Sequence, residues 1–501
     1  MRITQSLALL LTLLVCQAGA QTTNLAIRPV TLEECLQLAL QHNLDVQIER
    51  LEPEVARFTL SASYGIYDPT FKFFARNDFA SNPIQQDWKK GTLDKEYELD
   101  TDSMGSGIIG RLPTGMTYGL NGGVDYLHGN SAFPWGWYST NETDAAWTLT
   151  LKQPLLKDAW VDADRLKIKV NKKNLKIAEL ALRQEIINTV TKVQVAYYEL
   201  NFRREKLKVE EKALELARQL LKENRRRVEV GTLTKLDEMH TASLVATLES
   251  DVVSARQALA EQQNVLKTLI HDDFKAWAGM TLDPSEPLTA VPVSFNRAES
   301  WQKAMLQRPD LLQFRLDLEK RDLMVSYRFN QLFPSVDVFG SYGARGVRPT
   351  FDLAAGDVGD ITNPAYSYGV VLSVPLGSYA ERKNYKASQA ARKQGALRLK
   401  KFEQDILAQV EDAGLLVESA YQRLGSTRKA REYTEAAVAA EQEKLENGES
   451  TSYFLLQFQR DLVSARSAEI RALADYNKAV AQLSFSEGTT LEQRHIQVEI
   501  K

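Results

Sequence analysis

The sequence contains two copies of one pattern, and this duplication constrains the fold more than any other feature. Pro69 recurs as Pro334, 265 positions later, and Gly231 recurs as Gly448, 217 positions later. Both copies follow the same order of helix, proline, strand segment, proline, long helix, glycine and helix. Because solenoid repeats span only about 20–50 residues, this unit is too long to be one of them. We therefore expect a duplicated half, and two similar halves suggest a pseudo-symmetric wall or ring.

The N-terminus predicts secretion. Arg2 precedes an apolar run over residues 7–16, and the small residues Ala18, Gly19 and Ala20 follow it. This order is typical of a signal peptide, here cleaved before Gln21. The run is also shorter than the ~20 residues that a membrane-spanning helix needs.

The two cysteines carry little chemistry in the predicted mature chain. Cys16 lies in the signal peptide, and the bulky Val15 before it argues against a lipid anchor at that position. Only Cys35 is left after cleavage, which excludes an intramolecular disulfide.

Composition excludes two other classes of protein. With 44% hydrophobic and 25% charged residues, the 501-residue chain is not disordered by composition. A net charge of -3 without a clustered basic face argues against a nucleic-acid partner. Since no other segment reaches the length of a transmembrane helix, the chain would span a membrane with strands.

Two segments predict unusually long helices. Residues 162–228 lack proline and glycine, and apolar residues recur there every seven positions, at Ile186, Val193, Leu200, Leu207, Leu214, Leu221 and Val228. This heptad seam predicts a coiled-coil helix of about 100 Å. Residues 379–447 show the same character, although Gly395, Gly414 and Gly425 weaken it.

Each long helix is expected to turn back on itself. Gly231 and Gly448 suit the left-handed conformation that ends many helices. Ser and Thr residues follow each glycine and suit N-caps for second helices over 235–269 and 453–485. Each half therefore predicts a long antiparallel helical hairpin with a tight tip.

Period-two alternation predicts strands near the prolines. The alternating apolar residues are Phe71 and Phe73; Trp147, Leu149 and Leu151; Val336, Val338 and Tyr342; and Tyr366, Tyr368, Val370, Leu372 and Val374. This pattern is typical of outer-membrane strands, and a half-buried strand of a soluble sheet also produces it. Because a barrel needs about eight strands, these four would have to share one with copies of the chain.

The first half holds an additional segment. The stretch from Pro69 to Pro154 is 44 residues longer than that from Pro334 to Pro375. Two strand-like pieces in it are joined by Pro113-Thr114-Gly115, which fits a type I turn. We expect an added hairpin, either in the barrel or in an extracellular flap.

The sequence offers no reason to expect catalysis. Gly105–Gly110 formally matches a dinucleotide fingerprint, but Pro113 follows too closely for a helix to open there. The five histidines show no metal-ligand spacing; they are His42, His128, His240, His271 and His495. We therefore predict a protein without enzyme activity, cofactor or metal.

The chain resembles the TolC-like outer membrane efflux proteins. The motifs that carry the resemblance are Thr31-Leu32-Glu33-Glu34, Asn43-Leu44-Asp45, Tyr67-Asp68-Pro69-Thr70, Gln153-Pro154-Leu155-Leu156, Arg308-Pro309-Asp310-Leu311 and the glycines at 231 and 448. Each motif is weak alone, whereas their order and duplication over nearly the whole mature chain are specific.

The resemblance implies a mainly α fold with a membrane β-barrel. Each protomer would have two repeats of long antiparallel coiled-coil helices plus strand hairpins, and a homotrimer would form one barrel and one α-helical tunnel. The expected organisation is a signal peptide over 1–20, repeats over 21–286 and 287–486, and a polar, peripheral tail over 487–501. The proline-rich link over 272–296 would contribute to a belt around the helices.

The implied function is that of an exit duct in the outer membrane that extends into the periplasm. Its tips would dock a periplasmic adaptor bound to an inner-membrane pump, for tripartite efflux or type I secretion. Drug, metal and protein cargo stay open, because the pump selects the cargo. The alternative is a periplasmic or surface coiled-coil protein that conducts nothing.

The resemblance also locates the functional residues at the tips. The expected docking residues are Val228, Gly231, Thr232, Leu233, Leu445, Gly448, Glu449 and Ser450. The family often closes the tunnel with acidic side chains just past the tip glycine, and Asp237 matches this pattern in the first repeat. The second repeat has Phe454 there, so Tyr453 or Phe454 would form an apolar gate instead.

Overall fold

The computed structural model describes residues 26–82, 97–133, 136–447 and 449–496. Contacts divide the chain into two compact units. The first consists of residues up to Leu44, Thr189–Val293 and Leu416–Ala481, and the second of Asp45–Asn188, Ser294–Leu415 and residues from Gln482. Each unit combines segments from both halves of the sequence, so this division does not test the predicted repeats. The repeats over 21–286 and 287–486 therefore stay a prediction. The predicted signal peptide lies outside the described residues.

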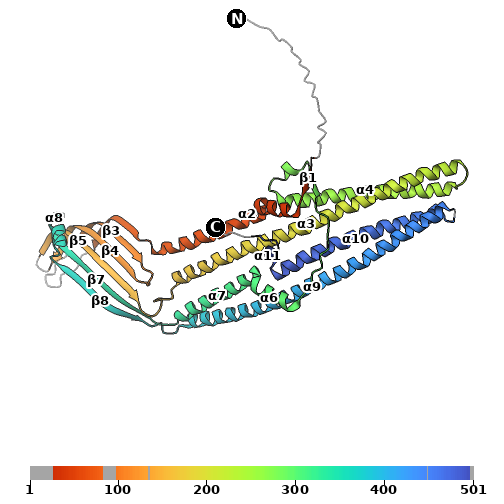
Figure 1. Cartoon of the computed structure of the whole chain (residues 1–501). Helices are drawn as coiled ribbons and strands as arrows, with labels where there is room; N and C mark the ends of the chain where they lie inside the picture. The colour runs from red at the N-terminus through yellow and green to blue at the C-terminus, as the bar shows by residue number, and fades with distance from the viewer. Residues whose placement is uncertain (1–25, 83–96, 134–135, 448, 497–501) are drawn as a thin grey trace, which may run out of the picture. The chain divides into compact units, whose positions relative to one another are not determined.

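Groups of helices alternate with groups of strands along the chain (Figure 1). The helices are α1 (Leu32–His42), α2 (Leu44–Ser63), η1 (Tyr64–Tyr67, a 3-10 helix), α3 (Ala163–Glu229), α4 (Lys235–Ile270), α5 (Phe274–Trp277), α6 (Arg297–Gln307), α7 (Pro309–Asn330), α8 (Phe351–Gly359), α9 (Tyr379–Glu446), α10 (Ser452–Glu487) and α11 (Thr490–Gln493). The strands are β1 (Ala26–Val30), β2 (Thr70–Asn82), β3 (Tyr97–Arg111), β4 (Thr117–Phe133), β5 (Gly136–Pro154), β6 (Met280–Pro284), β7 (Ser335–Arg348) and β8 (Pro364–Ser373).

The two long helices form as the sequence predicts. Helix α3 runs for 67 residues and α9 for 68, and the three glycines within α9 do not interrupt it. Helix α3 begins after Asp162, whose carboxylate accepts the backbone N–H of Arg165 at 2.6 Å, as an N-cap does. In the described part of the chain, no helix combines the length and the apolar character needed to cross a bilayer.

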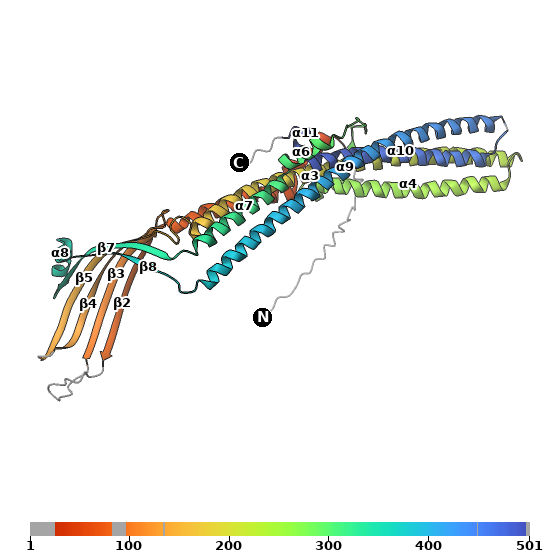
Figure 2. The same cartoon turned by 90° about the horizontal axis from the view of Figure 1, so that it is seen from below.

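The heptad seam of the first unit packs on α4. Leu214 and Ala217 of α3 form a buried cluster with Val245, Leu248 and Val252 of α4. In both views α3 lies beside α4, and α9 lies beside α10 (Figure 2). Because each fully buried aliphatic side chain contributes about 1.5–3 kcal/mol, this repeating contact holds the hairpin closed. The predicted helical hairpins are therefore confirmed.

A charged cluster links α3 to α10 within the first unit. The Glu199 carboxylate accepts hydrogen bonds from Arg203 on its own helix and from Arg471 and Lys478 on α10. Burial alone would raise the pKa of Glu199, but the hydrogen bonds from Lys478 and Arg203 lower it on balance. The carboxylate therefore stays ionised and connects the two helical hairpins.

Strands β1 and β6 form a small parallel sheet in the first unit. Val30 is fully buried there, and Ser285 donates its backbone N–H to the Val30 carbonyl at 3.0 Å. The link over 272–296, which the sequence left without assigned elements, thus carries α5 and β6.

The second unit contains a six-stranded antiparallel sheet in the order β2-β3-β4-β5-β7-β8. The added hairpin is β3–β4, and it lies inside this sheet, between β2 and β5. Its turn closes where Gly115 donates its N–H to the Leu112 carbonyl at 2.9 Å, with Gly115 at φ +86°. A left-handed residue at this position explains the glycine. The added hairpin is therefore confirmed, and its strands belong to the common sheet.

The strand register divides the sheet into two chemically different faces. One row crosses all six strands through directly paired residues, Phe71, Ile108, Leu120, Leu149, Tyr342 and Tyr366. The adjacent row on the opposite face is Thr70, Ile109, Gly119, Thr150, Ser341 and Ser367. Every residue of the first row is exposed, from Leu149 at 37% to Tyr366 at 73%. A continuous exposed apolar row indicates contact with lipid or with another chain.

Helices α6 and α7 pack against α9 in the second unit. Ala304 and Leu311 form a buried cluster with Ile406 and Val410. Two motifs of the family resemblance lie at helix starts: Thr31 caps α1 by accepting the N–H of Glu34 at 3.1 Å, and Pro309 occupies the first turn of α7.

The expectation of a peripheral C-terminal tail is wrong for its first residues. Residues 487–491 are buried. The hydroxyl of Ser300 donates to the Glu487 carboxylate, and the buried Arg308 donates to the Ser486 carbonyl at 3.3 Å. The polar composition of the tail hid this packing, because its polar groups find partners on α6 and at the start of α7.

Candidate functional site: the helical tips

The turn between α3 and α4 is a Schellman motif, which ends the long helix sharply. Thr232 donates its N–H to the Arg227 carbonyl at 2.8 Å, and Gly231 donates to Val228 at 3.0 Å. Gly231 has φ +79°, and a Cβ at this position would have no atom within 4 Å. The predicted left-handed cap is confirmed, and backbone conformation rather than space accounts for the glycine.

Helix α4 begins with a capping box. The Thr234 hydroxyl accepts the backbone N–H of Asp237, and the Asp237 carboxylate accepts the backbone N–H of Thr234 at 3.2 Å. The carboxylate also accepts the Thr234 hydroxyl at 2.6 Å. A capping box satisfies two backbone donors that the first helical turn leaves free. The structure thus gives the gate candidate Asp237 a local structural role as well.

The turn between α9 and α10 repeats this geometry in its described residues. Glu449 donates its N–H to the Lys444 carbonyl at 2.8 Å, and Phe454 donates to Thr451 at 3.1 Å. These pairs stand 217 positions after Thr232–Arg227 and Asp237–Thr234, the offset that relates the two tip glycines. Gly448 itself lies outside the described residues. The Ser450 hydroxyl donates to Glu441 of α9.

The tips expose apolar side chains, although not those named by sequence reasoning. Val228, Leu233 and Leu445 are half-buried, whereas Val230, Leu236 and Met239 are exposed. Val230, Leu236 and Met239 lie near Gly231 in the sequence, so they could have been predicted as exposed tip residues. Thr232 and Glu449 are exposed as expected.

An aromatic contact joins the two tips. The ring of Tyr453, at the start of α10, lies edge-on to His240 of α4 with centroids 6.1 Å apart. Phe454 lies next to Tyr453 with ring centroids 5.6 Å apart, and both aromatic side chains are half exposed. The structure therefore brings the two aromatic gate candidates together with a residue that sequence reasoning did not assign to the tips.

A groove lies between the two hairpins of the first unit. Its volume is about 450 Å³. Its walls come from α3, α4, α9 and α10 and mix aliphatic residues such as Leu216 and Leu462 with charged residues such as Lys206 and Arg460. A groove that combines apolar and charged residues can accept an amphipathic helix.

The family model of outer membrane efflux proteins matches residues 123–270 and 301–489. The chain belongs to the outer membrane efflux protein family. The matched segments include both long helices, both tips and strands β5, β7 and β8. The predicted family is thereby confirmed.

Solved outer membrane channels share the fold of this member of the family. The CmeC outer membrane channel of Campylobacter jejuni matches with a TM-score of 0.66 at 14% identity, over 92% of this chain and 86% of CmeC. VceC of Vibrio cholerae matches with a TM-score of 0.64 at 15% identity, over 91% of this chain and 96% of VceC. The open-state MtrE channel of Neisseria gonorrhoeae matches with a TM-score of 0.63 at 15% identity, over 93% of this chain and 91% of MtrE. No curated protein matches the chain by sequence.

Membership of the efflux family confirms the predicted fold class, function and location. The chain is an efflux duct protein of the outer membrane. The alternative of a coiled-coil protein that conducts nothing is not favoured by this membership. The docking and gating residues at the tips stay predictions.

Proposed function

We propose that three copies of the chain assemble into one passive exit duct, which crosses the outer membrane and extends into the periplasm. The duct performs no catalysis and holds no cofactor, and an inner-membrane pump supplies the energy. The tips dock a periplasmic adaptor that connects the duct to this pump. The observation that carries the proposal is the apolar row that crosses all six strands of the sheet while remaining exposed.

The ends of the sheet support assembly from copies. Within the described residues, β2 and β8 are the outer strands and pair on one side only. Unpaired strand edges invite pairing with another chain, and six strands are fewer than the roughly eight that a closed barrel needs. Joining β8 of one copy to β2 of the next gives a closed ring with lipid against the apolar row.

Helix α2 supports the same conclusion outside the sheet. Its exposed apolar residues repeat at alternating spacings of four and three, at Leu44, Ile48, Leu51, Val55 and Phe58. This spacing is that of a coiled-coil seam, in which such a stripe packs against another helix. A neighbouring copy would cover the stripe and remove it from water.

The tips and the groove support docking of an adaptor. Two sharp turns present the exposed Thr232 and Glu449 with the apolar Val230 and Leu236 at the ends of the hairpins. A helical hairpin of an adaptor that reaches these turns would find the groove between α3, α4, α9 and α10 beside it. We propose Val228, Gly231, Thr232, Leu233, Leu445, Gly448, Glu449 and Ser450 as the docking residues.

We also propose that Asp237, Tyr453 and Phe454 form the closed gate. Three copies would place three aromatic pairs and three carboxylates around the axis of the duct. Aromatic rings would narrow the opening, and carboxylates would favour cations there. The contact between Tyr453 and His240 supports this proposal, because it fixes the aromatic pair at the junction of the two tips.

Site-specific crosslinking in cells tests the docking proposal. Cys35→Ala removes the buried thiol, and Leu233→Cys or Glu449→Cys then adds one thiol at a tip. Arg398→Cys, at an exposed position of α9 that is 48 residues before its last residue, serves as the control. A short thiol–amine crosslinker should join the tip variants, but not the control, to a periplasmic adaptor protein. Equal crosslinking of the control, or none from either tip, would reject docking at the tips.

A further inference from the structure

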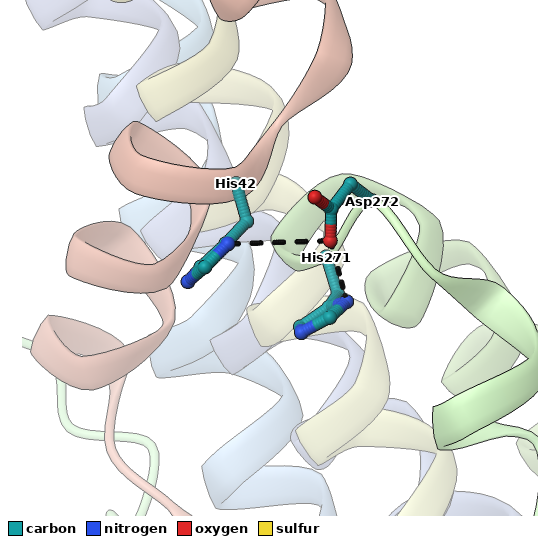
Figure 3. A group of neighbouring side chains, drawn as sticks. All are labelled: His42, His271 and Asp272. Carbon is teal, nitrogen blue, oxygen red and sulfur yellow. Dashed lines mark ion pairs between the residues drawn. The ribbon is translucent and has the colours of Figure 1, made fainter.

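Three potential metal ligands meet in the first unit, away from the tips. They are His42 at the end of α1, His271 just after α4, and Asp272 (Figure 3). One ligand atom from each residue lies within 4.8 Å of the others. His42 is far from the other two in sequence, which is why the spacing of the histidines gave no indication of this cluster.

The carboxylate of Asp272 lies close to both imidazoles. Its Oδ1 is 3.0 Å from Nδ1 of His271 and 4.0 Å from Nδ1 of His42. Within the described residues, these two histidines are the ion-pair partners of Asp272. Arg28, which lies over the Trp277 ring, is paired with Glu34 at 2.6 Å. In the described structure, Asp272 forms no ion pair with a lysine or arginine.

Nδ1 of His271 has two neighbours, a backbone N–H and the Asp272 carboxylate. Asp273 donates its N–H to Nδ1 of His271 at 3.0 Å, which requires a lone pair on this nitrogen. The Asp272 oxygen at 3.0 Å from the same nitrogen also carries lone pairs. The Nδ1 lone pair holds either this N–H or an ion, so an ion that binds at Nδ1 displaces the N–H of Asp273.

The surrounding packing holds the two segments together before any ion binds. Asn43 donates its side-chain N–H to the Leu269 carbonyl at 2.9 Å, which ties the end of α1 to the end of α4. The buried Trp277 packs against the His271 ring with centroids 5.1 Å apart. The rings of His42 and His271 stack at 4.9 Å with planes only 13° apart.

We propose that His42, His271 and Asp272 bind one divalent transition-metal ion of the Zn²⁺ class. Two imidazole nitrogens and one carboxylate oxygen are a ligand set that zinc accepts, with water as the fourth ligand. The side chains of His42 and Asp272 are 38% and 41% exposed, so ions and water reach the site from solvent. The bound ion cross-links α1 to the segment after α4.

Binding requires a small rearrangement. Ligand atoms on tetrahedral zinc lie about 3.3 Å apart, given bond lengths of about 2.0–2.1 Å. The nitrogen lone pairs of two stacked rings lie in parallel planes and do not converge on one ion. The half-exposed His42 ring therefore turns about its Cβ–Cγ bond toward the ion. This turn ends the stacking of the two rings.

Zinc titration of the full-length protein tests the site. The protein is purified from outer membranes without a polyhistidine tag, treated with EDTA, and titrated with ZnCl₂ by isothermal calorimetry. We expect one saturable ion per chain and a higher thermal midpoint with zinc. His42→Ala, His271→Ala and Asp272→Asn should each weaken binding by more than the roughly 10–100-fold typical of losing an outer-shell partner.

Two controls separate coordination from misfolding. His240→Ala removes an exposed histidine at the tip and should leave zinc binding unchanged. His42→Gln keeps a polar side chain of similar size, and its far-UV circular dichroism should match that of the unaltered protein while zinc binding is lost. The proposal would be overturned if the protein bound no saturable zinc ion. It would also be overturned if the His42, His271 and Asp272 variants bound zinc as tightly as the unaltered protein.

Discussion

The Asp237 carboxylate accepts both the backbone N–H and the hydroxyl of Thr234, at 3.2 and 2.6 Å. The residue proposed as the acidic part of the gate is therefore also part of the helix cap that closes its own tip. The two roles depend on different properties, since capping needs an acceptor oxygen and gating needs the negative charge. Substitutions can separate them.

Thr234→Ala should weaken the cap without altering the gate. Loss of an N-cap side chain costs about 1 kcal/mol, so the thermal midpoint should fall while ion selectivity stays the same.

Asp237→Asn keeps an acceptor oxygen and removes the charge, so it should lower the preference for cations. Reversal potentials in planar bilayers measure this preference. Unchanged selectivity in Asp237→Asn would remove Asp237 from the gate.

Phe454→Ala should raise the conductance of the closed duct. Phe454 lies beside Tyr453 and is half exposed, so its ring can project into an opening formed by several copies. Phe454→Leu keeps apolar bulk and serves as the matched control, with conductance closer to that of the unaltered protein. Single-channel recording gives the comparison. If Phe454→Ala leaves the conductance unchanged, the aromatic gate is wrong.

The same glycine-to-alanine change should have opposite effects at two positions. Gly231 has φ +79°, so Gly231→Ala should cost about 1–2 kcal/mol of stability. Gly425 lies within α9, where an added Cβ would have no atom within 4 Å, so Gly425→Ala should add about 0.5–1 kcal/mol. Thermal midpoints of the two variants test the pair. A stabilising Gly231→Ala would contradict the left-handed turn.

The buried Cys35 thiol should make stability depend on pH in alkaline solution. Burial raises the pKa of this thiol to about 12 from 9.0. Above about pH 9 the unfolded chain loses this proton and the folded chain keeps it, so stability falls by about 1.4 kcal/mol per pH unit up to about pH 12. Denaturation at several pH values should show this slope, reduced in Cys35→Ala. Identical slopes in the two proteins would contradict the buried thiol.

The helical part of the fold was readable from sequence because its signals are local and periodic. The heptad positions from Ile186 to Val228 predicted α3, and Gly231 predicted its end. The capping box was also within reach, since Thr234 and Asp237 have the spacing of that motif with an aspartate as the acid. The location of the added hairpin was not readable from the sequence, because apolar and polar residues alternate in the same way in an extracellular flap and in a membrane sheet.

Contacts between distant segments could not be predicted. His42 meets His271 and Asp272 only because α1 packs beside the end of α4, where Asn43 contacts Leu269. His240 meets Tyr453 only because the two tips lie together in the first unit. The buried start of the tail likewise depends on Ser300, whose partner Glu487 is 187 residues away. No periodicity within one segment carries this information.

The central claim is that copies of this chain complete one conducting duct. The most direct measurement combines the mass of the detergent-solubilised protein with its conductance in planar bilayers. The account predicts a trimer that opens stable channels, and that separates into single chains when heated in detergent. A protein that remains a single chain under native conditions and gives no channels would contradict it.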